Sequence, residues 1–131
     1  MRIITSQENG RAPVTIFRIE GDIATESAEE LQQQASDAFE AGARHLLLDL
    51  SKVSFISSSG LRAIHYIFLL FRSDSQEDDK VLRKGLMDGT YYSPRLKLLR
   101  PTRNVRQALT LAGYDLFLEI HTDLNQAIAS F

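Results

Sequence analysis

The sequence contains no cysteine and no dominant charge. Without cysteine, disulfide bonds, zinc sites with thiolate ligands and thiol nucleophiles are excluded. The 15 Lys and Arg residues nearly balance the 17 Asp and Glu residues, and the formal net charge is −2. A polyanion such as nucleic acid is therefore not favoured as a partner.

Long hydrophobic runs are also missing. The longest apolar-rich segment, residues 64–71, is far too short to cross a bilayer. Residues 1–14 lack the apolar core of a signal peptide. We therefore expect a soluble protein.

The composition that is present fits one globular domain. The chain has 131 residues, of which 44% are hydrophobic and 24% charged. These proportions are ordinary for a soluble protein and too apolar for a disordered one. A chain of this length can bury a modest core without covalent crosslinks. We therefore expect a single domain over residues 1–131.

The chain is organised around residues 45–72, HLLLDLSKVSFISSSGLRAIHYIFLLFR. The apolar run at 46–50 predicts a strand buried on both faces, and a strongly apolar helix is expected from about Ser58. Serines therefore lie where the strand gives way to the helix. At that point a hydroxyl caps unpaired amides well, and a phosphate is tolerated by the helix dipole.

The N-terminal third predicts a hairpin and a helix. Strands are expected at residues 2–5 and 14–19, separated by turn-forming residues. The pattern Ser27-x-x-Glu30 predicts a capping box at the start of the helix, with Thr25 as a competing cap. Gly42 is expected to end this helix. The residues expected to face the core are Ala28, Leu31, Ala35 and either Ala38 or Phe39.

The C-terminal third predicts two further strand and helix pairs. A strand is expected at residues 95–100, followed by a helix that Thr102 caps and Gly113 ends. Its expected inward residues are Val105, Ala108, Leu109 and Ala112. An edge strand at 115–120 and a short helix capped by Thr122 or Asp123 complete the chain. The final helix is expected to bury Leu124, Ala127 and Ile128.

Residues 73–94 interrupt this alternation. The segment opens acidic, continues basic and contains Gly85, Gly89 and Pro94. We interpret it as a long surface loop or insertion at about 73–95. The remaining elements alternate between strand and helix, which predicts an α/β fold. Its expected architecture is a mixed, mostly parallel sheet of about five strands, with four helices and an N-terminal hairpin.

Few catalytic patterns are present. His65 follows the serines, but the G-x-S-x-G elbow of hydrolases is absent, as are the glycine-rich phosphate-binding loops. His45, His65 and His121 are far apart and lack metal-ligand spacing. No enzyme activity, metal or cofactor is expected. From the residues alone, the serines are helix caps more often than modification sites.

The run DLSKVSFISSSGLRAI resembles the signature of the STAS domain, which is shared by bacterial anti-sigma factor antagonists and the cytoplasmic tails of sulfate transporters. The segments NVRQAL and AGYDLF also resemble this family. The resemblance covers most of the chain, with one insertion. The family motif D-S-S-G-L has Ser57 at the aspartate position here, and the motif G-E-L-D has Ala24 at its last position.

The resemblance implies a function. Such antagonists bind a serine kinase that is also an anti-sigma factor, and this kinase phosphorylates the first serine after the aspartate. By position that serine is Ser58, with Ser57 and Ser59 as less favoured acceptors. The implied partner surface comprises Asp22, Ser57, Ser58, Ser59, Gly60, Leu61 and Arg62. The implied protein is a bacterial, cytoplasmic, non-enzymatic phosphoprotein that regulates transcription.

Two alternatives stay open. The first is an unregulated scaffold or homodimer, because the apolar helix from Ser58 leaves a wide surface that a second chain could cover. The second is a ligand-binding or lipid-binding accessory of a transporter. Membrane insertion and nucleic-acid binding are not expected in either case.

Overall fold

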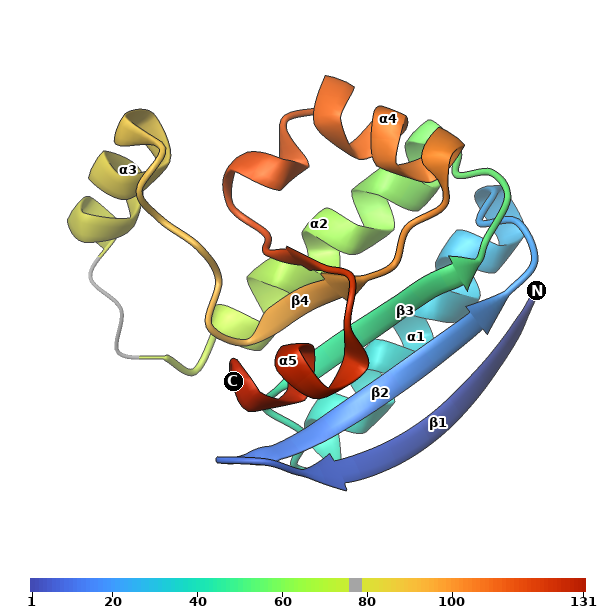
Figure 1. Cartoon of the computed structure of the whole chain (residues 1–131), viewed down its shortest axis with the longest axis horizontal. Helices are drawn as coiled ribbons and strands as arrows, with labels where there is room; N and C mark the ends of the chain where they lie inside the picture. The colour runs from blue at the N-terminus through green and yellow to red at the C-terminus, as the bar shows by residue number, and fades with distance from the viewer. Residues whose placement is uncertain (76–78) are drawn as a thin grey trace.

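The computed structural model describes residues 1–75 and 79–131, and its five strands form one sheet in the order β1-β2-β3-β4-β5 (Figure 1). The first two strands form an antiparallel hairpin, and all later neighbours are parallel. The strands are β1 (Arg2–Asn9), β2 (Pro13–Glu20), β3 (Leu46–Lys52), β4 (Leu96–Leu99) and β5 (Ile120–His121). This sheet confirms the expected fold class.

Helices cover both faces of the sheet. In the view of Figure 1, α1 and α2 lie behind the sheet and α5 lies in front of it. The helices are α1 (Thr25–Glu40), α2 (Ser58–Arg72), α3 (Asp79–Asp88), α4 (Arg103–Leu111) and α5 (Leu124–Ala129), with a short 3-10 helix η1 (Tyr114–Leu116). Four of these helices match the four that the sequence predicts, and α3 is additional.

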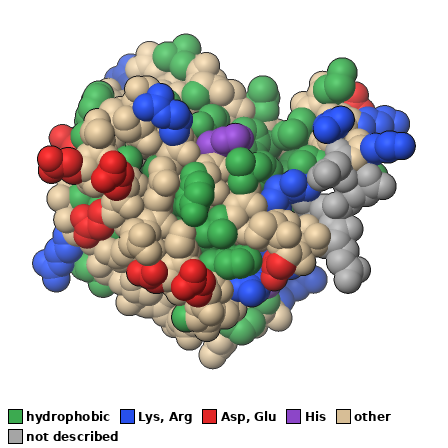
Figure 2. All heavy atoms as spheres, turned by 180° about the vertical axis from the view of Figure 1, so that it is seen from behind, with side chains coloured by type: hydrophobic (Ala, Val, Ile, Leu, Met, Phe, Trp, Pro, Cys, Tyr) green, Lys and Arg blue, Asp and Glu red, His purple; other side chains and the backbone are tan. Residues whose placement is uncertain are grey.

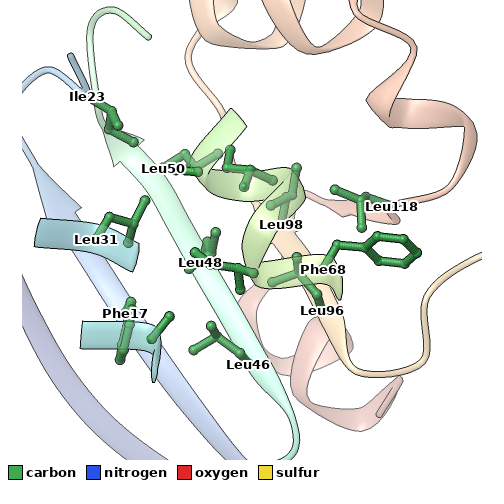
Figure 3. Close-up of a cluster of buried hydrophobic side chains, with 14 of the residues drawn as sticks. Phe17, Ile23, Leu31, Leu46, Leu48, Leu50, Phe68, Leu96, Leu98 and Leu118 are labelled. Carbon is green, nitrogen blue, oxygen red and sulfur yellow. The ribbon is translucent and has the colours of Figure 1, made fainter. Parts of the chain in front are cut away.

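The central strand β3 is buried on both faces. Leu46, Leu48 and Leu50 point into the main core beneath α1 and α2 (Figure 3). Leu47 points the other way, into a smaller cluster that α5 covers. Burying a leucine side chain contributes about 1.5–3 kcal/mol. The continuous apolar run therefore gives the sheet its central strand, as the sequence predicts.

Most of the apolar surface of α2 is buried. Its core face consists of Ala63, Ile64, Ile67, Phe68 and Phe71, while Leu61 and Leu70 are half-buried against the same core. Tyr66 and Leu69 are exposed, at 41% and 46% of their surfaces. Burial beneath the sheet thus accounts for all but a narrow apolar stripe of this helix.

The expected cap of α1 was wrong. Ala24 is the N-cap residue and Ser27 lies at the third helical position. From there the Ser27 hydroxyl accepts a hydrogen bond from the Ala24 backbone N–H at 2.7 Å. The serine therefore satisfies the start of the helix from inside it. The predicted end was right, because Gly42 follows the last turn with φ of 110°.

The segment 73–94 is not simply a loop, because it contains α3. Leu82 of this helix is buried in the main core, and Gly85 packs against Tyr91 so closely that a Cβ would lie 2.7 Å from the Tyr91 Cβ. The Tyr91 ring in turn contacts Phe68, with centroids 6.3 Å apart. These contacts fix a helix that projects from the body of the molecule (Figure 1).

The segment after α4 also differs from expectation. Residues 115–120 were expected as a strand. Instead, the first of them belong to η1, and of this range only Ile120 lies in β5, where it pairs with Leu98. The Tyr114 hydroxyl donates to the Leu61 carbonyl at 2.8 Å, and the Phe117 ring packs 4.9 Å from that of Phe68. These contacts hold the segment after α4 against α2, so its first residues do not form a strand. The strand β5 does lie at the sheet edge, as expected.

Two smaller expectations for α4 were also wrong. Thr102 is its N-cap residue, but the hydroxyl donates to the Val53 carbonyl at 2.6 Å instead of capping the helix. Ala112 is exposed rather than inward. Val105 and Leu109 are buried, and Gly113 ends the helix with φ of 80°.

A buried lysine holds α5 against the sheet. Lys97 of β4 is 3% exposed, and its ammonium group donates to the Ser130 carbonyl at 2.8 Å and pairs with Glu119 at 2.9 Å. A buried charge is tolerated only when it is paired and hydrogen-bonded. Asp123 caps α5 by accepting from the Gln126 N–H, which resolves the choice between Thr122 and Asp123.

Candidate functional site

Three adjacent serines lie at the junction between β3 and α2, and their hydroxyls make different contacts. Ser57 is the N-cap residue, with extended backbone, and its hydroxyl accepts from the Gly60 N–H at 3.1 Å. It thereby satisfies one of the amides that a helix start leaves unpaired. The capping expected from the sequence is thus supplied by Ser57.

Ser58 is the first residue of α2, and its side chain is exposed. Its hydroxyl has no hydrogen-bond partner among the residues that the structure describes. Because Ser57 already caps the helix, nothing in the described fold requires the Ser58 hydroxyl. The Ser58 hydroxyl is therefore exposed at the surface without a structural role in the described fold.

Ser59 is half-buried and contacts a basic residue. Its hydroxyl accepts from Arg62 Nη2 at 3.2 Å, one helical turn further along. Arg62 also lies four residues after Ser58, and residues at this spacing are neighbours on a helix surface. A positive side chain thus stands beside the exposed hydroxyl.

Gly60 is fixed by close packing. A Cβ at this position would lie 2.6 Å from Ile56 Cγ1 and 2.8 Å from the Ile23 carbonyl oxygen. Distances below 3 Å are not tolerated without movement of the neighbours. The first turn of α2 therefore sits directly on two other segments, and only glycine fits there.

The segment after β2 is bound to the serine loop through Ile23. The Ile23 N–H donates to the Phe55 carbonyl at 3.0 Å, and the Ile23 carbonyl accepts from the Ser57 N–H at 2.9 Å. Ile23 and Ile56 form a parallel bridge. Asp22, an exposed site residue predicted from the sequence, is the neighbour of Ile23 and is thereby brought beside the serine loop. Ile23 itself was not predicted from the sequence as part of the site. The available signal was that Ile23 is an apolar residue within GDIA, residues 21–24.

Tyr114 joins the other side of the junction to α2. Its hydroxyl donates to the carbonyl of Leu61, which packs half-buried against the core. Burial raises the pKa of Tyr114, and the positive charge of Arg62 opposes this shift. The phenol therefore stays protonated and keeps its hydrogen bond. The motif AGYDLF contained this residue, but its contact with α2 was not predicted.

The exposed side of α2 continues the candidate site away from the serines. Arg62, Tyr66 and Leu69 follow Ser58 at helical spacing, and all are exposed. Phe55, in the loop before the helix, is 54% exposed. This set of Phe55, Ser58, Arg62, Tyr66 and Leu69 is called the α2 stripe below. It combines apolar contact area with one basic group.

The histidines do not gather at the junction. His65 lies on α2 near the rings of Phe68 and Tyr114, whereas His45 contacts Phe131 and His121 contacts Glu119. Across residues 1–75 and 79–131, no three His, Asp or Glu side chains lie close enough together to hold a metal ion. None of the helices in these ranges has both the length and the apolar character needed to cross a bilayer.

The family model of the STAS domain matches residues 4–76 of the chain. This match covers more than half of the 131 residues and includes the whole β3–α2 junction. The chain belongs to the STAS domain family. The sequence resemblance is thereby confirmed, and α3, which begins at Asp79, lies beyond the matched part. Among curated proteins, no sequence match to this STAS domain is found.

Solved structures share the fold over nearly the whole chain. A candidate anti-sigma factor antagonist from Thermotoga maritima matches with a TM-score of 0.68 and 22% identity, covering 88% of this chain and 84% of its own. The anti-sigma factor antagonist SpoIIAA in its unphosphorylated form matches with a TM-score of 0.67 and 17% identity, covering 95% and 93%. The phosphorylated form of SpoIIAA from Bacillus gives 0.62 and 16%, covering 95% and 96%. At these identities the likeness establishes the fold.

Proposed function

We propose that this STAS domain is a bacterial, cytoplasmic anti-sigma factor antagonist that binds an anti-sigma factor kinase through the α2 stripe and the first turn of α2. Phosphorylation of Ser58 is the proposed switch, and the protein itself is not an enzyme. The observation that supports this most is that the Ser58 hydroxyl is exposed and unengaged while Ser57 caps the helix. The likeness to SpoIIAA, a phosphorylated antagonist, gives independent support for the class.

The site can accept a phosphate without unfolding. A phosphate on Ser58 would lie at the N-terminus of α2, where unpaired amides and the helix dipole favour negative charge. Arg62, one turn along, offers a positive partner. The modification would therefore change the affinity for the docking partner and leave the fold intact.

The proposed mechanism is electrostatic. The unmodified serine is neutral, and the partner docks on the α2 stripe and displaces a sigma factor. A phosphate adds about −1.5 to −2 charges in the middle of that surface. Acidic groups on the partner are then repelled, and the complex dissociates. Because Ser57 and Ala24 replace acidic residues of the family pattern, these two positions contribute no negative charge before modification.

Incubation with ATP and the anti-sigma factor kinase encoded nearest to this chain tests the proposal. Trypsin releases residues 53–62 as one peptide. We expect mass spectrometry to find one phosphate on Ser58 of this peptide. The phosphate should be absent in Ser58→Ala and retained in Ser59→Ala. A phosphate on Ser57 or Ser59, or none at all, would contradict the proposed switch.

The exposed Tyr66 and Leu69 favour one other function, an unregulated scaffold that uses the same stripe as a permanent interface. In that case the kinase would leave the peptide unmodified. Leu69→Ser would nevertheless weaken the complex with the chain bound at the α2 stripe, because the interface is the same.

A further inference from the structure

The strand β1 presents a long, unpaired sheet edge. It contains eight residues and lies at the end of the strand order, with β2 as its neighbour on the inner side. Its pairing with β2 runs without a bulge from Arg2 opposite Glu20 to Asn9 opposite Pro13. In Figure 1, no other described element lies beyond its outer edge. Half of its backbone N–H and C=O groups therefore face outward, available to another strand.

Natural sheet edges are usually protected by lysine, proline, bulges or a short strand. The sequence RIITSQEN has no lysine and no proline, and six of its eight residues are exposed. Its two charged residues, Arg2 and Glu8, have opposite signs and lie near opposite ends. Both belong to the even-numbered positions, so their side chains point to the same face of the sheet.

The backbone restricts how two copies of β1 can pair. Outward-facing groups occur on alternate residues, so a residue of one copy can oppose only a residue of the same parity in the other. Two antiparallel registers pair seven residues under this rule, one centred on Ser6 and one centred on Thr5. We choose the register centred on Thr5, because only this register sets residues of opposite charge against each other. It places Thr5 opposite Thr5, Ile4 opposite Ser6, and Ile3 opposite Gln7. Arg2 then lies opposite the partner subunit's Glu8 at both ends.

We propose that a second copy of this chain docks on β1 in this antiparallel register and joins the two sheets. Arg2 has only a distant partner within its own chain, with Nη1 4.0 Å from Glu20 Oε1 and a side chain 75% exposed. Glu8 has no ion-pair partner among the described residues. Pairs of threonines and pairs of opposite charges are both favourable across strands. The strand is thus complementary to itself, which favours a copy over an unrelated peptide.

This interface is separate from the α2 stripe. It uses the outer edge of β1, whereas Ser58 lies at the start of α2, which follows β3, and β2 separates β1 from β3 in the sheet. The mostly polar composition of β1 predicts a weak dimer that forms with rising concentration. Such a dimer would present two Ser58 sites, but its existence does not depend on the proposed function.

Charge reversal tests the register by sedimentation equilibrium. The wild-type chain should form a dimer, and Arg2→Glu or Glu8→Arg should each weaken it about tenfold or more, because like charges then face each other. An equimolar mixture of the two variants should regain the wild-type affinity as a heterodimer, and so should the double variant. Arg11→Glu in the hairpin loop is the matched control and should change nothing. Circular dichroism confirms that each variant is folded.

A crosslink tests the two-fold position directly. The native chain has no cysteine, so Thr5→Cys introduces a single thiol. Directly opposed residues have Cα atoms about 4.5–5.5 Å apart, within disulfide range. Oxidation should therefore crosslink Thr5→Cys but not Gln7→Cys, which lies on the same face two residues away. Three results would each overturn the proposal. They are a monomeric wild type, a dimer whose affinity is unchanged by both charge reversals, and preferential crosslinking of Gln7→Cys.

Discussion

Ser57 and Ser58 are adjacent in the chain and identical in chemistry, but their surroundings differ. Ser57 holds the first turn of α2 through the Gly60 amide. Ser58 lies one residue further on, exposed, with its hydroxyl unengaged among the described residues. One serine therefore stabilises the fold, and the described fold makes no use of the hydroxyl of the other.

This division predicts opposite outcomes for two alanine substitutions. Ser57→Ala removes the cap and should lower the free energy of unfolding by about 1 kcal/mol. Ser58→Ala removes an exposed group and should stay within about 0.5 kcal/mol of wild type. Urea denaturation followed by circular dichroism measures both. Equal losses in the two variants would mean that Ser58 also supports the helix.

At the residue scale, the sequence predicted where α2 begins but not all of the contacts around its first turn. The motif SSSGL indicated the start of a helix, and the structure confirms this. It did not indicate which serine caps the helix, because all three hydroxyls are chemically able to do so. It also did not indicate that Ile23 and Tyr114 contact the junction from other parts of the chain.

At the element scale, a three-residue ion cluster fixes the end of α2. Arg44, which precedes β3, donates to Asp74 Oδ2 at 2.7 Å, and Arg95, which precedes β4, donates to the other carboxylate oxygen. Arg95 also donates to the Phe71 carbonyl at 3.2 Å. Asp74 thus ties the segment that leads toward α3 to the starts of two strands.

The Asp74 cluster predicts a pH dependence of stability. Desolvation acts to raise the pKa of Asp74, but the hydrogen bonds from Arg95 and Arg44 outweigh it, and the pKa is lowered overall. A carboxyl with a lowered pKa in the folded state stabilises the fold above its ordinary pKa. That contribution disappears as the pH falls through the lowered value. The stability difference between wild type and Asp74→Asn should therefore be present at pH 7 and shrink in acid.

Urea denaturation at a series of pH values measures this difference. The Arg44→Gln background is the control, because one of the two hydrogen bonds that lower the pKa is already absent there. In that background, the effect of Asp74→Asn should be smaller at pH 7. A difference that stays constant from neutral to acid pH would show that the cluster does not stabilise the fold through this charge.

The elements that the sequence missed depend on tertiary contacts. Val81, Leu82, Leu86 and Met87 lie among charges and near glycines, and this local pattern favours a loop. The helix α3 forms because Leu82 reaches the core and Gly85 packs on Tyr91. Similarly, DLFLEI alternates like a strand, but Tyr114 and Phe117 pack on α2 first. In contrast, the burial of residues 46–50 can be predicted without knowing which elements pack against them, since it follows from their own apolar composition.

At the scale of the whole molecule, the fold presents separate surfaces to solvent. The α2 stripe lies on the layer that α1 and α2 form behind the sheet in Figure 1, and the β1 edge lies at the rim of the sheet. From behind, basic side chains gather on the projecting lobe that contains α3, whereas acidic side chains lie mainly on the body (Figure 2). The mixed, mostly parallel sheet with its N-terminal hairpin was predictable from the alternation of strands and helices. The distribution of charge over the surface was not, because it depends on how distant segments meet.

Isothermal titration calorimetry of the anti-sigma factor partner with wild type and Ser58→Asp tests the central claim most directly. We predict that the wild type binds and that Ser58→Asp binds at least about tenfold more weakly, because a charge enters the interface. Ser58→Ala should bind as the wild type does. Equal affinities of Ser58→Asp and wild type would contradict the account.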